Sequence, residues 1–132
     1  MTIQIDSREK ERAIKSIVSY FDENGVKHFT SKLYVGDYCN LENPLLCVDR
    51  KQNLQELCGN VCQQHERFRN EIIRANENGI KIVFLCEHGG SIKELEDVIF
   101  WNNPRSTVRK KINGRWTEVR TKAMTGQRLY KV

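Results

Sequence analysis

The stretch L-Y-V-G-D-Y-C-N-L-E-N-P-L-L-C-V-D-R-K, from Leu33 to Lys51, combines short apolar strands with charged residues at the strand ends. Asp37 follows directly after one predicted strand, and Asp49 and Lys51 stand two residues apart at the end of a later one. Residues two apart on a strand share a face, so Asp49 and Lys51 converge on one spot. Asp37 reaches the same spot if its strand is a neighbour in the sheet.

Two carboxylates and a lysine at a sheet edge suit the metal-dependent hydrolysis of phosphodiesters. Carboxylate oxygens hold Mg²⁺, which keeps most of its water ligands. The metal stabilises charge on the phosphate and lowers the pKa of a bound water, and the lysine positions or activates that water. The spacing by itself is a weak signal, because ordinary surface salt bridges produce it about as often.

The sequence around this stretch alternates predicted strands and helices. Strands are predicted at residues 2–5, 26–35, 38–41, 45–48 and 80–86. The dense apolar run of the last strand indicates a central position in the sheet. Helices are predicted from a cap at Ser7 to Glu23, as a broken pair within residues 54–78, and after a cap at Ser91. This order predicts an α/β domain with a mixed central sheet flanked by helices.

The charge of the 132-residue chain is divided unevenly between two segments. Residues 1–101 carry 13 basic and 16 acidic side chains, a net charge of −3, whereas residues 102–132 carry nine basic residues against Glu118, a net charge of +8. We expect a single domain with a core at 1–101 and a basic C-terminal arm at 102–132. A hairpin that turns at Asn113-Gly114 and a short helix at the chain end are predicted within the arm. Such an arm is typical of polyanion binding, although a solvated charge run explains the charge equally well.

Several classes of protein are disfavoured by the sequence. No apolar run approaches the roughly 20 residues of a membrane span, and no secretory signal is visible, so we expect a cytoplasmic or nucleoid-associated protein. The odd count of five cysteines indicates free thiols. Cys58, Cys62 and His65 have the spacing of half a zinc site, but the second ligand pair is missing, which favours ordinary cysteines on a helix face.

Four short motifs together are more specific than the acidic spacing. They are I-D-S-R-E at 5–9, V-G-D-Y at 35–38, V-D-R-K at 48–51 and E-R-F-R-N-E at 66–71. In this order and at these intervals they resemble the XPF-type nucleases, the structure-specific endonucleases of excision repair, which have a restriction-endonuclease-like fold. The resemblance covers about residues 3–100, and the small size is similar to stand-alone members from phages and mobile elements.

The resemblance implies a role for each matching residue. Acidic ligands around Mg²⁺ or Mn²⁺ would be Asp6, Asp37 and Asp49. Lys51 would be the catalytic lysine, and Arg8 and Arg50 would bind phosphate or brace the carboxylates. Predicted DNA-binding residues are Arg67, Arg109, Lys110, Lys111 and Arg115.

The sequence departs from the family pattern at two positions. Asp49 stands where the family usually has Glu, and the acid expected four residues after the lysine falls on Gln55, with Glu56 adjacent. A helix shifted by one residue would let Glu56 replace it.

The resemblance predicts a Mg²⁺- or Mn²⁺-dependent endonuclease for branched or flap-like DNA that acts as a homodimer. The alternative is a non-catalytic DNA-binding or scaffolding module of the same fold. The presence of all three aspartates and the lysine favours the enzyme.

Overall fold

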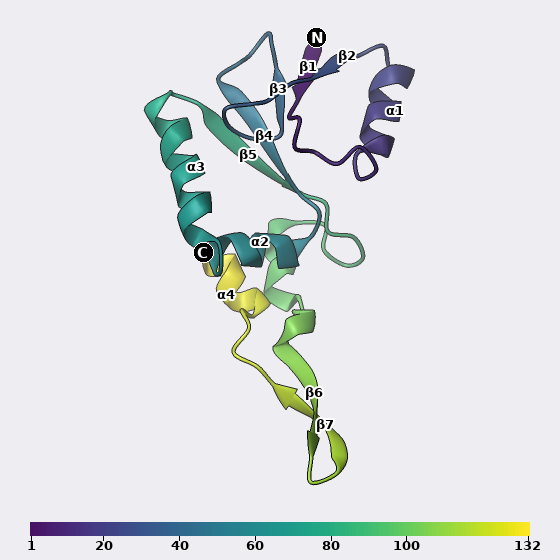
Figure 1. The fold of residues 1–132 in the computed structure, drawn as a ribbon, viewed down its shortest axis with the longest axis vertical. Coiled ribbons are helices and arrows are strands. Elements are labelled where there is room, and N and C mark those ends of the chain that lie inside the picture. The colour runs from purple at the N-terminus through teal and green to yellow at the C-terminus, as the bar shows by residue number, and fades with distance from the viewer.

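The computed structural model describes residues 1–132 and places a five-stranded sheet, its helices and a projecting hairpin along one axis (Figure 1). The elements in chain order are β1 (Thr2–Ile5), α1 (Lys15–Glu23), β2 (Lys27–Thr30), β3 (Tyr38–Asn40), β4 (Leu46–Lys51), α2 (Leu54–Val61), α3 (His65–Glu77), β5 (Lys81–Cys86), the 3₁₀ turns η1 (Leu95–Phe100) and η2 (Pro104–Ser106), β6 (Thr107–Ile112), β7 (Arg115–Arg120) and α4 (Gly126–Lys131).

The sheet has the strand order β2-β1-β3-β4-β5. β1 pairs parallel with β2 and antiparallel with β3, β3 pairs antiparallel with β4, and β4 pairs parallel with β5. In Figure 1, α1 lies on one side of this sheet and α3 on the other, with α2 across the end of β4. The predicted mixed sheet flanked by helices is confirmed.

The buried apolar side chains form three small clusters. One joins β1, β3 and the start of α1, and a second lies between the loop before β3 and strands β3 and β4. The third joins α2, η1 and α4, and its buried members are Leu54, Cys58, Val98, Trp101 and Leu129. Because Leu129 belongs to this cluster, the C-terminal helix packs on the same body as the sheet.

Three sequence predictions for individual elements are wrong. Ser7 does not cap α1, which begins at Lys15, because residues 6–13 form consecutive turns. The strand predicted for residues 26–35 ends at Thr30, because the Leu33 N–H donates to the Asp6 carboxylate instead of a neighbouring strand. β5 is an edge strand and not a central one.

The helix predicted from Ser91 is also different in the structure. A 3₁₀ turn begins at Leu95, and the Asp97 carboxylate caps its start by accepting from the Lys93 and Glu94 N–H groups at 2.9 and 3.0 Å. Cys58 is buried as expected, but Cys62 lies beyond the end of α2 and is exposed.

The C-terminal predictions are confirmed element by element. The β6–β7 hairpin turns at Asn113 and Gly114, whose φ angles of 51° and 77° are those of a type I′ turn. The chain ends in the short helix α4. None of the helices combines the length and the apolar character that crossing a bilayer requires.

Candidate active site

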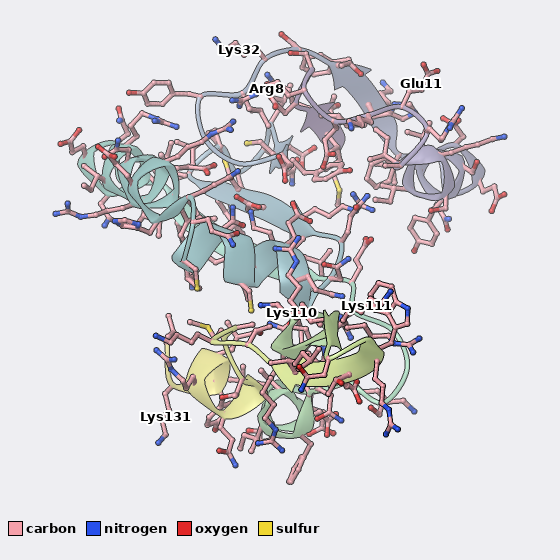
Figure 2. All side chains as sticks on the ribbon, turned by 60° about the horizontal axis from the view of Figure 1, so that its bottom comes forward. Arg8, Glu11, Lys32, Lys110, Lys111 and Lys131 are labelled. Carbon is pink, nitrogen blue, oxygen red and sulfur yellow. The ribbon has the colours of Figure 1, made fainter.

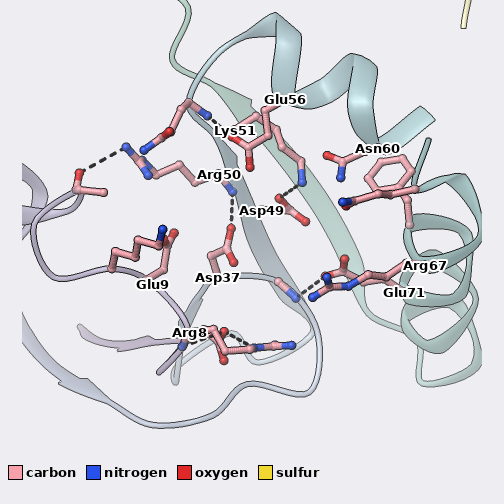
Figure 3. Close-up of a pocket in the computed structure, with 17 residues that line it drawn as sticks. Arg8, Glu9, Asp37, Asp49, Arg50, Lys51, Glu56, Asn60, Arg67 and Glu71 are labelled. Atoms are coloured by element: carbon pink, nitrogen blue, oxygen red, sulfur yellow. Dashed lines mark hydrogen bonds and ion pairs between the residues drawn. The ribbon is translucent and has the colours of Figure 1, made fainter. Parts of the chain in front are cut away.

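A polar cleft of about 400 Å³ lies where the loop before β3, the end of β4 and the faces of α2 and α3 meet. Of the 17 residues that line it, only Ala13 and Phe68 are hydrophobic. Figure 3 shows Asp37, Asp49 and Lys51 around the same opening. The convergence predicted from the strand ends is therefore present in the structure.

Asp49 and Lys51 form a buried ion pair on β4. The Lys51 Nζ lies 2.8 Å from the Asp49 Oδ1, and both side chains are less than a tenth exposed. The Lys51 Nζ also lies 5.5 Å from the centroid of the Phe68 ring, over its face. Burial raises the pKa of Asp49, although the adjacent Lys51 ammonium opposes this rise. The Asp49 Oδ1 makes no hydrogen bond of good geometry.

Asp37 is fixed to β4 by two hydrogen bonds. Its Oδ2 accepts from the Arg50 N–H at 2.8 Å, and its own N–H donates to the Val48 carbonyl at 2.8 Å. Burial raises the pKa of Asp37 to about 7, despite the hydrogen bond from Arg50 and with a further contribution from the charge of Asp49. Burial therefore disfavours the ionised form of both Asp37 and Asp49, and of the two only Asp49 is in an ion pair with the Lys51 ammonium.

Asp6 and Arg8 form a pair at the edge of the cleft. The Arg8 Nε donates to the Asp6 Oδ2 at 2.7 Å, and the Leu33 N–H donates to the Asp6 Oδ1 at 2.8 Å. Burial alone would raise the pKa of Asp6, but the bonds from Arg8 and Leu33 outweigh it and lower the pKa. Both Asp6 oxygens are therefore engaged with protein donors, while the Arg8 side chain stays half exposed.

Arg50 braces two other segments instead of projecting freely. Its Nε donates to the Glu87 Oε2 at 2.9 Å, beyond the end of β5, and its Nη2 donates to the Ala13 carbonyl at 3.4 Å. Of the site aspartates, only Asp37 bonds to Arg50, and it does so through the Arg50 backbone N–H and not through the guanidinium. The Arg50 guanidinium links the start of α1 to the end of β5 across the floor of the cleft.

Helices α2 and α3 supply the opposite wall of the cleft. Glu56 lines it and accepts a hydrogen bond from the Gln52 N–H at 2.7 Å, whereas Gln55 faces a separate groove on the other flank of α2. Glu56, and not Gln55, therefore lines the cleft, and its replacement of the family's acid stays a prediction. From α3, Arg67 lines the cleft with an exposed side chain, and the Glu71 Oε1 accepts from the Gly36 N–H at 3.0 Å.

A sequence profile of the ERCC4 domain matches residues 5–127 of this chain. The chain belongs to the ERCC4 domain family. The resemblance to XPF-type nucleases and the restriction-endonuclease-like fold class are confirmed, and with them membership in a structure-specific nuclease family that acts on DNA. No curated protein and no solved structure matches the chain significantly.

The ERCC4 match extends beyond residue 100, where the sequence resemblance ended, and includes the β6–β7 hairpin. The hairpin carries Arg109, Lys110, Lys111 and Arg115 away from the cleft. Figure 1 places the hairpin at the opposite end of the molecule from β1, and Figure 2 shows Lys110 and Lys111 well separated from Arg8. The predicted DNA-binding residues therefore form two groups, with Arg67 at the cleft and the other four on the hairpin.

Two acidic residues of this ERCC4 domain were assigned no role from the sequence. Glu9 lines the cleft, and burial raises its pKa, with Arg50 opposing and the nearby acids adding to the rise. Glu71 holds the Gly36 amide and so fixes the turn before Asp37. Glu9 ends the I-D-S-R-E motif and Glu71 ends the E-R-F-R-N-E motif, and these positions are the sequence feature that marks them as candidate site residues.

The donor set of this ERCC4 domain fits a Mg²⁺ or Mn²⁺ ion. No three His, Cys, Asp or Glu side chains are grouped so as to hold a metal by protein ligands alone. Mg²⁺ commonly binds through one or two carboxylates and completes its shell with water and substrate phosphate. The Asp49 carboxylate, whose Oδ1 is paired with Lys51 alone, and the neighbouring Asp37 carboxylate supply that kind of site. Asp6 stays a predicted ligand, and its two oxygens already accept hydrogen bonds from Arg8 and from the Leu33 N–H.

Proposed function

We propose that this protein is a Mg²⁺- or Mn²⁺-dependent endonuclease that hydrolyses phosphodiester bonds in branched or flap-like DNA. The observation that carries the proposal is the convergence of Asp37, Asp49 and Lys51 in one polar cleft of an ERCC4 domain. A surface salt bridge does not account for this arrangement, because the Asp49–Lys51 pair is buried and desolvated.

Asp37 and Asp49 are the residues that would hold the metal. When bound, the metal supplies charge for the developing phosphorane and a water of lowered pKa. The protein contributes fixed positions for both carboxylates, since Asp37 is bonded to the backbone of β4 and Asp49 is part of that strand. The Arg50 N–H fixes the Asp37 carboxylate and the Lys51 ammonium fixes that of Asp49, which favours catalysis by preorganised charge.

Lys51 is placed to hold or move a proton beside the reacting phosphate. Its Nζ contacts the Asp49 Oδ1 and the Phe68 ring, and no other charged partner lies within ion-pair distance. A lysine held by one carboxylate and one aromatic ring keeps N–H bonds that can point into the cleft. It would orient the attacking water and stabilise charge on a non-bridging phosphate oxygen.

Arg8 and Arg67 are suited to bind the DNA backbone next to the scissile bond. Both line the cleft with exposed guanidinium groups, and each comes from a different wall. Guanidinium groups bind phosphates bidentately, so the two residues would fix the strand across Asp37 and Asp49. The hairpin residues Arg109, Lys110, Lys111 and Arg115 would hold a second part of the DNA.

A homodimer is part of the proposal. Its support is the edge strand β5, where Val83, Phe84 and Leu85 are exposed and one row of backbone groups has no neighbouring strand. Sedimentation of the wild-type protein and of Leu85→Lys tests the assignment: we expect a dimer for the wild type and a monomer for the variant.

The deciding experiment compares labelled flap, fork, four-way junction and linear duplexes, each with Mg²⁺ and with EDTA. We expect cleavage of the branched substrates in Mg²⁺ only, and loss of cleavage in Asp49→Asn. Glu96→Gln is the matched control, because it removes an exposed acid that does not line the cleft, and it should cleave normally. Binding without cleavage under every metal condition would instead support the non-catalytic DNA-binding module.

A further inference from the structure

The β6–β7 hairpin has two chemically different faces. Residues that pair directly across antiparallel strands lie on the same face, and alternate residues along a strand lie on opposite faces. The register pairs Lys111 with Trp116, Arg109 with Glu118 and Thr107 with Arg120. These six residues form one face, here called the Trp116 face. The other face, here called the Val108 face, consists of Val108, Lys110, Ile112, Arg115, Thr117 and Val119.

The Trp116 face presents an unpartnered aromatic ring among cations. Trp116 is 65% exposed, whereas the other tryptophan, Trp101, is 8% exposed and belongs to the core. The Trp116 indole stacks on none of the other aromatic rings in the structure. Three cations and one acid share its face, and Trp116 stands one residue pair inside the pair that closes the turn.

The two strands of the hairpin lie outside the core, but the base of the hairpin is fixed to the rest of the protein. Only Thr107 and Val119 of its two strands are even half-buried, and Figure 1 shows the strands extending beyond every other element. Its base is fixed because the Asn103 Nδ2 donates to the Met124 carbonyl at 2.9 Å. The Trp116 ring is therefore held in solvent near the tip of a hairpin whose base is fixed to the rest of the protein.

The base of the hairpin connects to the catalytic cleft through α2. Arg105 and Lys122 flank the base and line a groove of about 380 Å³ with Gln55, on one side of α2. Glu56 and Asn60, on the adjoining side of the same helix, line the cleft. Basic side chains thus lie across α2 from the cleft, at the base of the hairpin.

We propose that the Trp116 face binds unpaired bases of the DNA strand that leaves the branch point, with Trp116 stacking on a base and Lys111 and Arg109 contacting its phosphates. This inference rests on the proposed function, since it names the part of the substrate that the hairpin reads. A side chain that stacks on bases needs an open π-face and flanking cations, and single-strand binding proteins combine these two features. Bases inside a continuous duplex are already stacked on both sides, so the indole distinguishes an open strand from a closed one.

Intrinsic tryptophan fluorescence provides a direct test, measured in EDTA so that no cleavage occurs. The probes are an oligo(dT) strand, a blunt duplex of equal length, and a fork with oligo(dT) arms. We expect oligo(dT) and the fork to quench the wild type, and the blunt duplex to quench it much less. Trp116→Phe retains only the buried Trp101 and should show no quenching with any of the three.

Affinities for labelled DNA test the energetic part of the proposal. We expect Trp116→Ala to weaken oligo(dT) binding by roughly 5- to 150-fold, which corresponds to about 1–3 kcal/mol for one stacked base. Trp116→Phe should retain most of the affinity. Phe100→Ala is the matched control, because Phe100 is an 81% exposed aromatic outside the hairpin, and it should bind as the wild type does.

A second pair of variants tests the face without touching the indole. Lys110 and Lys111 are adjacent and remove the same charge when mutated, but they lie on opposite faces. We expect Lys111→Ala to weaken oligo(dT) binding more than Lys110→Ala does. Equal losses in the two variants, or an equal loss for blunt duplex and oligo(dT) in Trp116→Ala, would overturn the proposal. Quenching without any cleavage in Mg²⁺ would support base binding by the Trp116 face and reject the nuclease. Cleavage without quenching would support the nuclease and reject base binding by this face.

Discussion

The carboxylate of Asp37 accepts a hydrogen bond from the backbone N–H of Arg50 at 2.8 Å, across the end of the β3–β4 pair. This bond holds an acid of the turn before β3 beside the acid and the lysine of β4. Asparagine at position 37 keeps an oxygen acceptor for the same donor. Asp37→Asn therefore removes the charge and keeps the hydrogen bond, so this variant separates the effect of charge from that of structure.

Asp37→Asn and Asp49→Asn should each abolish metal-dependent cleavage and leave the fold intact. Each change removes a ligand charge, and the loss of metal catalysis costs several kcal/mol of transition-state stabilisation. DNA binding should persist or strengthen, because a negative charge near the phosphates disappears. Cleavage rates and circular dichroism of both variants check the prediction. Rates near that of the wild type in both variants would contradict the site assignment.

Asp37→Asn should also stabilise the metal-free protein at alkaline pH. Burial raises the pKa of Asp37 to about 7 in the folded state, whereas the unfolded carboxyl ionises near 4. The folded state therefore binds more protons between these values, and this group makes stability fall as the pH rises from about 4 to 7. In urea unfolding with EDTA, we expect the variant to gain about 1–3 kcal/mol over the wild type at pH 8 and almost nothing near pH 4. A gain that is the same at both pH values would show that the charge is not its cause.

Lys51→Ala should slow hydrolysis by roughly 10²–10⁴-fold while metal still binds, the range for losing a positioned proton-transfer group. The Lys51 Nζ contacts Asp49, so its removal leaves that carboxylate free to hold a cation. Calorimetry with Mn²⁺ and single-turnover rates measure the two halves separately. If metal affinity collapses and bound complexes react at the normal rate, the role given to Lys51 is wrong.

Neutralising Arg109, Lys110 and Lys111 together should weaken DNA binding and flatten its salt dependence. Each lost phosphate contact lowers the slope of log K against log salt by roughly 0.9 on a duplex and by roughly 0.7 on a single strand. Cleavage at saturating DNA should change little, because the three residues lie on the hairpin and not in the cleft. Titrations at several salt concentrations provide the measurement. An unchanged slope would assign the DNA surface to Arg8 and Arg67 instead.

Gly126→Ala should destabilise the protein strongly, by about 1–3 kcal/mol or more. A Cβ at this first residue of α4 would meet the backbone carbonyls of Val98 and Trp101, the second at 2.7 Å, and backbone cannot rotate away. Gly59→Ala in the interior of α2 is the control, since its Cβ would meet only the end of the Gln63 side chain at 3.9 Å. We expect this control to be neutral or to gain about 0.5–1 kcal/mol. Equal thermal stability of the two variants would reject close docking of α4.

Elements that depend only on neighbouring residues could be predicted from the sequence. The alternation at Thr2–Ile5 predicted β1 with its observed bounds, and Asn113-Gly114 predicted the hairpin, because a type I′ turn needs two residues that tolerate positive φ. The edge position of β5 was missed for a tertiary reason. Its apolar run is typical of a central strand, and the sequence cannot show that no strand pairs beyond it.

Some residues of the candidate site could likewise be predicted from the sequence, and others could not. Asp37, Asp49 and Lys51 could be brought together from strand spacing, because β4 fixes two of them and β3 is its neighbour. Glu71 could not be assigned, since its role is a bond to the Gly36 amide, 35 residues away in the chain. The face that Trp116 shares likewise depends on hairpin register, which only the structure gives.

Both ends of the β6–β7 hairpin are fixed to the rest of the protein, so the length of its strands can change without moving its base. Asn103 bonds to the chain after β7, and α4 docks on η1, so both ends of the hairpin are held independently of its tip. Two residues added to each strand would move the turn outward by about 7 Å and return every side chain to its original face. Under the proposed function, such an insertion would increase the distance between the cleft and the DNA held near the hairpin turn, and the residues of the cleft would stay the same.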